Sequence, residues 1–139
     1  MGDAILETLA AEHRQLDELL GRFLTAAHVG DPEGARECLT RFDEALRLHT
    51  AFEEEHLFAA AAGEKLVPAE QESEDARLSR ELRLEHVQIR ELSGMLRRLL
   101  EEKKDLEAAL RLFPNLARRW DAHTTKEEAA FGPQGAQPA

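Results

Sequence analysis

Six residues whose side chains can bind metal ions recur in two matching sets along this chain. They are four histidines and two glutamates: His13, His49, Glu53, His86, His123 and Glu127. Each glutamate follows a histidine by four residues, so on a helix the two side chains of such a pair project from one face. Neutral imidazole and carboxylate groups suit iron, manganese or zinc. If the six residues meet, two carboxylates between two pairs of histidines favour a dinuclear metal centre.

The residues between these side chains predict the helices that position them. Apolar residues recur at helical spacing almost throughout, and no strand pattern is present. We expect four helices, over about residues 3–28, 32–61, 70–102 and 105–131. Asp31 and Asp105 are predicted to cap the second and fourth helices, and Pro114 is predicted to kink or split the fourth. The predicted fold is an all-α, up-down-up-down four-helix bundle over residues 1–131, followed by a disordered tail over 132–139.

The two halves of the chain repeat one another. His86 lies 73 residues after His13, and this offset aligns the first helix with the third. An offset of 74 residues brings His49 onto His123 and aligns the second helix with the fourth. The repeat predicts a pseudo-twofold axis through the bundle. Since each histidine stands at a similar number of residues from the nearest connection, we expect all six side chains to meet in one layer.

If these six side chains are buried together, the negative charge of the two carboxylates needs a cation to balance it. Two carboxylates and four imidazoles placed together without a cation would cost several kcal/mol. A metal ion removes that cost, and one zinc ion would leave several of the six groups unused. We therefore interpret the set as ligands of a metal centre.

The pattern of ligands resembles the hemerythrin-like (HHE cation-binding) family. The resemblance includes the Glu-His pairs at residues 12–13 and 85–86 and the two His-xxx-Glu-Glu segments, and it covers about residues 5–131. It implies two iron ions, bridged by an oxo or hydroxo group, with zinc or manganese as substitutes. It also implies that His13 and His49 bind one iron, that His86 and His123 bind the other, and that the two glutamates bridge them.

One position departs from the oxygen-carrying members of this family. Those proteins have a fifth histidine one turn after the third ligand, where this chain has Arg90, which cannot act as a ligand. The chain therefore resembles the four-histidine, two-glutamate branch, similar to bacterial HHE proteins and to the iron-sensing domain of an F-box ubiquitin-ligase subunit. This resemblance implies a protein that binds or reacts with O2, peroxide or NO in redox or iron homeostasis.

Several other residues have open roles. His56 shares the face of His49 and Glu53, so it could supply a fifth nitrogen, although a place at the rim of the site fits the repeat better. Arg90 and Asp17 could form an ion pair near the cluster or lie on outer faces, and we favour outer or half-buried positions. Glu54 and Glu128 are expected beside the site. Cys38, Phe113 and Trp120 are predicted to pack in the core.

The composition narrows the class of protein. Acidic residues outnumber basic ones by 28 to 18, so we expect no nucleic-acid or anionic-membrane partner. A single cysteine excludes an internal disulfide and indicates a cytoplasmic protein, and no apolar run reaches the ~20 residues of a membrane span. The sequence does not define the oligomeric state or decide whether the protein is an enzyme. The alternatives to a reactive di-iron protein are an iron-sensing or iron-storing module, or a structural bundle with a vestigial or zinc-occupied site.

Overall fold

The described part of the chain consists of four long helices. The structure is a computed structural model that describes residues 2–56 and 73–131. The helices are α1 (Gly2–His28), α2 (Pro32–His56), α4 (Glu74–Glu102) and α5 (Leu106–Phe131). The predicted residues 57–61 of the second helix, 70–72 of the third helix and the tail at 132–139 lie outside the described residues.

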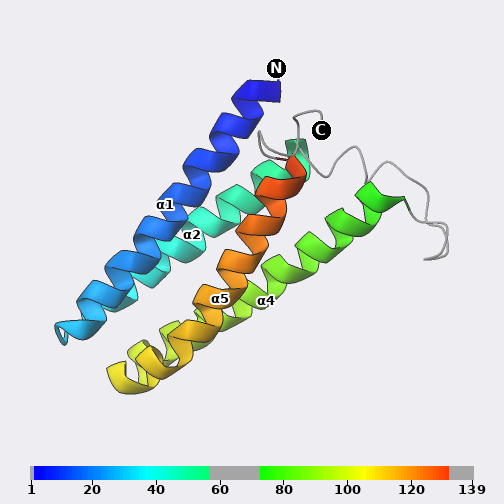
Figure 1. Cartoon of the computed structure of the whole chain (residues 1–139). Coiled ribbons are helices and arrows are strands. Elements are labelled where there is room, and N and C mark those ends of the chain that lie inside the picture. Colours follow the sequence, from blue (N-terminus) through cyan, green and yellow to red (C-terminus); the bar gives the residue numbers. More distant parts are fainter. Residues whose placement is uncertain (1, 57–72, 132–139) are drawn as a thin grey trace.

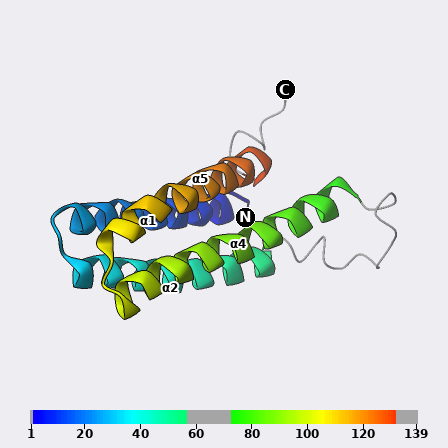
Figure 2. The same ribbon diagram turned by 90° about the horizontal axis from the view of Figure 1, so that it is seen from below.

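The helices form an up-down-up-down bundle. α1 packs against α2 and α5, and α4 packs against the same two helices, so the four occupy the corners of a square. Consecutive helices run in opposite directions, and the start of α1 lies at the same end of the bundle as the end of α5 (Figure 1). The view from below shows the same arrangement along the bundle (Figure 2). The predicted all-α four-helix bundle is confirmed.

The predicted helix caps are present. The Gly34 backbone N–H donates to Asp31 Oδ1 at 3.0 Å, and the Ala108 N–H donates to Asp105 Oδ1 at 2.9 Å. A third cap was not predicted: the Ala76 N–H donates to Ser73 Oγ at 3.1 Å, so α4 begins at Glu74 and not near residue 70. These side chains satisfy N–H groups that the first turn of a helix leaves without a partner.

Pro114 does not split α5. The helix runs without a break from Leu106 to Phe131, so the prediction of a split is wrong. Proline removes only one hydrogen bond of the helix. On either side of it, Phe113 and Leu116 are buried in the core and hold the helix in place.

An apolar core fills the half of the bundle near the two short connections. Its largest members come from all four helices and include Phe23, Phe42, Leu96 and Phe113. The rings of Phe23 and Phe113 stack with their centroids 5.1 Å apart. Because this core occupies the interior next to the connections, the six potential ligands lie together further along the helices.

Gly30 and Lys104 mark the two short connections, and they are equivalent in the repeat. Both have a positive φ, of 75° at Gly30 and 50° at Lys104. After Gly30 the Asp31 N–H donates to the Ala26 carbonyl at 2.9 Å, and the Asp105 N–H returns in a similar way to the Leu99 carbonyl at 3.1 Å. Glycine adopts this left-handed conformation readily, whereas other residues lose about 1–2 kcal/mol.

Replacement of Lys104 by glycine should therefore stabilise the protein. We expect Lys104→Gly to raise the free energy of unfolding by about 1 kcal/mol, measured by urea denaturation. Lys103→Gly is the matched control, because Lys103 has a φ of −114° and is also an exposed lysine at the end of α4. Equal effects of the two substitutions would contradict the explanation from backbone conformation.

Candidate metal centre

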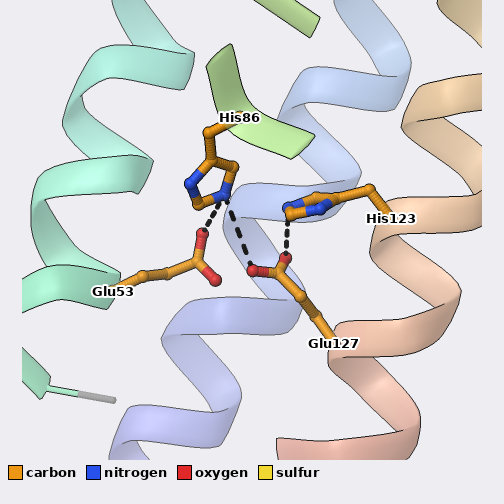
Figure 3. Close-up of side chains that lie close together, drawn as sticks. All are labelled: Glu53, His86, His123 and Glu127. Carbon is orange, nitrogen blue, oxygen red and sulfur yellow. Dashed lines mark ion pairs between the residues drawn. The ribbon is translucent and has the colours of Figure 1, made fainter. Parts of the chain in front are cut away.

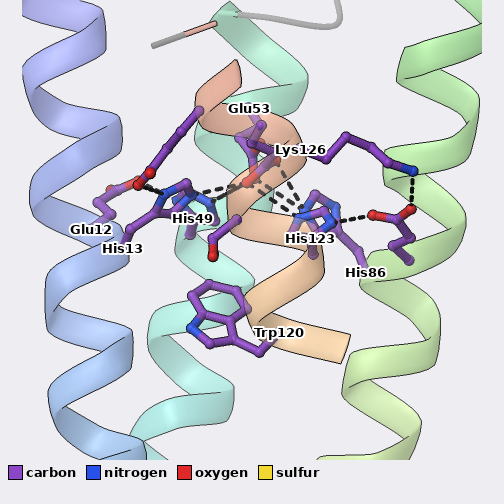
Figure 4. A network of polar contacts seen from close by, with 12 residues as sticks. Glu12, His13, His49, Glu53, His86, Trp120, His123 and Lys126 are labelled. Carbon is purple, nitrogen blue, oxygen red and sulfur yellow. Dashed lines mark hydrogen bonds and ion pairs between the residues drawn. The ribbon is translucent and has the colours of Figure 1, made fainter. Parts of the chain in front are cut away.

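The six predicted residues lie together in the interior of the bundle. Every helix contributes to the cluster: α1 with His13, α2 with His49 and Glu53, α4 with His86, and α5 with His123 and Glu127. Figure 3 shows Glu127 with three of these residues, and Figure 4 shows the four histidines with Glu53. None of the six residues is more than 2% exposed. We refer to these residues as the inner cluster.

The four imidazoles of the inner cluster form two pairs. The ring centroids of His13 and His49 are 4.8 Å apart, and those of His86 and His123 are 4.4 Å apart. The distance from His49 to His86, across the two pairs, is 6.4 Å. The structure thus groups the histidines by chain half.

Each glutamate lies between the two pairs. Glu53 Oε1 is 2.7 Å from His49 Nε2 and 3.1 Å from His86 Nε2. Glu127 Oε1 is 2.9 Å from His13 Nε2 and 3.2 Å from His123 Nε2 (Figure 3 shows the Glu127–His123 contact). Each carboxylate therefore contacts imidazoles of both pairs. These four contacts are exchanged by the repeat, as the predicted pseudo-twofold axis requires. Glu127 departs from this symmetry, because its Oε1 also lies 3.6 Å from His49 Nε2 and its Oε2 lies 3.7 Å from His86 Nε2.

A layer of carboxylates surrounds the inner cluster and orients the imidazoles. His49 Nδ1 donates to Glu12 Oε1 at 2.7 Å, and His123 Nδ1 donates to Glu85 Oε1 at 2.8 Å. Because an ionised carboxylate can only accept, Nδ1 carries a proton in both histidines, and Nε2 is the nitrogen that faces the cluster. Sequence reasoning used Glu12 and Glu85 only as part of a family motif. Their matched positions directly before His13 and His86 were the available signal.

Burial and hydrogen bonding together set the protonation of the inner cluster. Burial lowers the pKa of His13, and burial with the nearby His86 lowers the pKa of His123 to about 4. Burial disfavours the charged form of His49 too, but Glu53 and Glu12 outweigh it and raise the pKa of His49. Burial would raise the pKa of Glu53, yet its contacts with His49 and His86 prevail and lower that pKa to about 2. Neutral imidazoles and ionised carboxylates are the forms that bind metals.

Several nitrogen and oxygen atoms of the inner cluster that could bind a cation have no hydrogen-bond partner in the described part of the chain. Within the described residues, no hydrogen bond of acceptable geometry reaches either oxygen of Glu53, Oε2 of Glu127, or Nε2 of His49 and His123. Buried polar atoms without partners are costly. Two sets of residues each bring their potential ligand atoms to within 4.8 Å of one another. The first set consists of Glu53, His86, His123 and Glu127, and the second of His13, His49 and Glu127. Glu127 belongs to both, so the donor set suits two neighbouring cations.

Three other candidate residues lie outside the inner cluster. His56 is exposed at the end of α2, with its ring centroid 4.6 Å from that of Phe52, and it belongs to neither set of potential ligands. Arg90 is exposed and forms no ion pair with Asp17, which instead accepts a hydrogen bond from Trp120 Nε1 at 2.6 Å. The favoured outer positions of Arg90 and Asp17 are confirmed, and the alternative ion pair is wrong.

The predicted neighbours Glu54 and Glu128 have different roles. Glu128 Oε1 is 3.1 Å from His13 Nδ1, so this carboxylate lies beside the inner cluster as expected. Glu54 instead accepts two hydrogen bonds from Arg83, at 2.5 and 2.9 Å. Trp120, predicted as ordinary core, also contacts the cluster, with its ring centroid 5.7 Å from that of His13.

A four-helix bundle whose interior collects an imidazole from every helix and carboxylates from two of them belongs to the class of helical cation-binding proteins. The sequence model of the hemerythrin HHE cation-binding domain matches residues 4–135, and the chain belongs to this family. No curated protein and no solved structure matches the chain. None of the described helices has the length and apolar character that a membrane span requires.

The metal-free protein should lose stability in acid because of these buried groups. The pKa of His123 falls from 6.5 to about 4 on folding, so between those values the unfolded chain binds more protons and unfolding becomes easier as the pH falls. Glu53, with its pKa lowered from 4.5 to about 2, adds a further loss below pH 4.5. We expect a decrease of a few kcal/mol between pH 6.5 and 4, measured by urea denaturation with chelator present. His123→Leu should make this slope shallower, and an unchanged slope would contradict the assignment.

Proposed function

We propose that this chain is a non-haem di-iron protein of the hemerythrin type that binds or reacts with a small oxidant such as O2, peroxide or NO. One observation carries the proposal: buried nitrogen and oxygen atoms of four imidazoles and two carboxylates converge, and several of them have no hydrogen-bond partner among the described residues. Membership of a cation-binding family supports the same conclusion.

The contacts suggest how the inner cluster would hold two ions. His13 and His49 would bind one ion, and His86 and His123 the other, because the imidazoles are grouped in these pairs. Glu53 and Glu127 would be shared, because each carboxylate already contacts both pairs. Zinc or manganese could use the same donors.

The chemistry of such a centre is the binding and reduction of small oxidants at positions that protein ligands leave open. The chain's own residues prepare the site for it. Glu12 and Glu85 hold the imidazoles of His49 and His123 with Nε2 facing inward. Leu9 and Leu82, both buried one turn before His13 and His86, cover the cluster on the side away from the apolar core. Arg90, one turn after His86, is exposed and offers no fifth imidazole at this position.

The first test is the metal content of protein expressed with supplemented iron. We expect about two irons per chain by elemental analysis, together with ligand-to-metal charge-transfer bands in the near-ultraviolet absorption spectrum. His49→Leu should lose most of this iron, because it removes a ligand and leaves Glu53 with fewer partners. His56→Leu is the matched control on the same helix and should retain the iron. One zinc, or no metal, in a fully helical protein would contradict the di-iron proposal.

An iron-sensing or iron-storing role is the second candidate, and one observation favours it. The donors come from all four helices, so removal of metal would loosen contacts that join every helix to its neighbours. Ligand binding of this kind stabilises the folded state by about 3 kcal/mol at a hundredfold excess over Kd.

A comparison of stability with turnover separates the two functions. A reactive centre should catalyse the loss of hydrogen peroxide, and His49→Leu should abolish that activity while His56→Leu preserves it. A sensor or store should show no turnover, but chelation should lower its melting temperature by several degrees. Absence of catalysed peroxide or NO loss from the two-iron protein would contradict the reactive function and leave the binding function.

A further inference from the structure

The two halves of the inner cluster have nearly identical carboxylates behind them. Glu12 and Glu85 are equivalent in the repeat, and their side chains are 27% and 26% exposed. They accept hydrogen bonds from His49 and His123 at almost the same distance, 2.7 and 2.8 Å. These two carboxylates therefore do not distinguish the halves, whereas the charges in the next layer do.

Lys126 supplies such a difference. Its Nζ lies 2.5 Å from Glu85 Oε2 and 3.7 Å from Glu81 Oε2. Figure 4 shows Lys126 on the outer side of His86 and His123. The repeat equivalent of Lys126 is Phe52, which carries no charge. Among the described residues, no lysine or arginine forms an ion pair with Glu12.

A second cation repeats this asymmetry. Arg83 forms an ion pair with Glu54, whereas Ala10 stands at the equivalent position of α1. Glu128, the repeat equivalent of Glu54, contacts His13 Nδ1 and has no lysine or arginine partner among the described residues. Two carboxylates without a cation among the described residues, Glu12 and Glu128, thus lie behind the first histidine pair. Glu85, behind the second pair, is paired with Lys126, and Glu54 is paired with Arg83.

These charges alter the imidazoles as ligands. A carboxylate that accepts the Nδ1 proton raises the basicity of the imidazole and strengthens its bond to a metal. A cation paired with that carboxylate reduces this increase in the basicity of the imidazole. Building on the function proposed above, we infer that Lys126 makes the two metal positions unequal, so that an ion binds more tightly at His13 and His49 than at His86 and His123. Lys126 is in this sense a positioning residue that acts through Glu85.

Titration of the metal-free protein with Zn2+ tests this inference without any activity. Because a first cation repels a second, unequal binding steps alone do not identify the tighter position. The readout is therefore the ring 15N resonances of the histidines: those of His13 and His49 should respond to the first equivalent of Zn2+, and those of His86 and His123 to the second. A simultaneous response, or the reverse order, in the wild-type protein would overturn the inference.

Substitution of Lys126 should change the order of binding. In Lys126→Gln we expect the ratio of the two dissociation constants to fall by about tenfold, so that both histidine pairs respond together. Lys126→Arg keeps the charge and should retain the wild-type order. Since Lys126 is 39% exposed, both variants are expected to fold, which circular dichroism would verify. An unchanged ratio in Lys126→Gln would contradict the role of this lysine.

The equivalent glutamates provide a matched pair. Glu12→Gln should weaken the tighter site by 10–100-fold, whereas Glu85→Gln should have a smaller effect, because Lys126 already neutralises Glu85. Equal effects would again overturn the inference. Two ions bound with equal strength would leave the proposed function intact, whereas a wild-type protein that binds no Zn2+ or iron would overturn both.

Discussion

The structure depends on two glutamates that have no contact with solvent. Glu53 and Glu127 are 0% exposed, and an ionised carboxylate in such a place is strongly destabilising unless positive charge or hydrogen-bond donors surround it. In this bundle the surrounding groups are imidazoles from α1, α2, α4 and α5. Because each carboxylate contacts histidines on at least two helices, the relative positions of all four helices are fixed by the same few contacts. A cation at the centre would use the same atoms.

The rest of the fold keeps these contacts in register. The apolar core lies between the inner cluster and the two short connections, and it determines the depth at which the histidines lie along each helix. The caps at Asp31 and Asp105 fix where α2 and α5 begin. Any shift of a cap by one residue would rotate the following helix by about 100° and turn its histidine away from the centre. Helix ends are thus part of the geometry of the site.

Most of the fold and the inner cluster could be predicted from the sequence, because both depend on periodic patterns. The His-xxx-Glu spacing and the apolar stripes place side chains on one face without knowledge of the tertiary structure. The features that could not be predicted depend on contacts between distant segments, or on which of several neighbouring residues caps a helix. Ser73 is one of several neighbouring polar residues that could cap the start of α4, so the sequence alone does not single it out. The continuity of α5 through Pro114 depends on the burial of Phe113 and Leu116 in the core. The roles of Glu12 and Glu85 required knowledge of which helices are neighbours.

The inner and outer layers differ in how far the two halves can diverge. An inner glutamate contacts both histidine pairs, so a change in one half disturbs the other half as well, and the repeat is kept closely there. Lys126 and Arg83 are partly exposed and form ion pairs with carboxylates outside the inner cluster: Lys126 with Glu81 and Glu85, and Arg83 with Glu54. A charge gained at these positions changes the electrostatics of one metal position while the buried contacts stay the same. The ligands can therefore keep the symmetry of the repeat while the charges around them differ. These outer charges provide a way to change the electrostatics of each metal position separately.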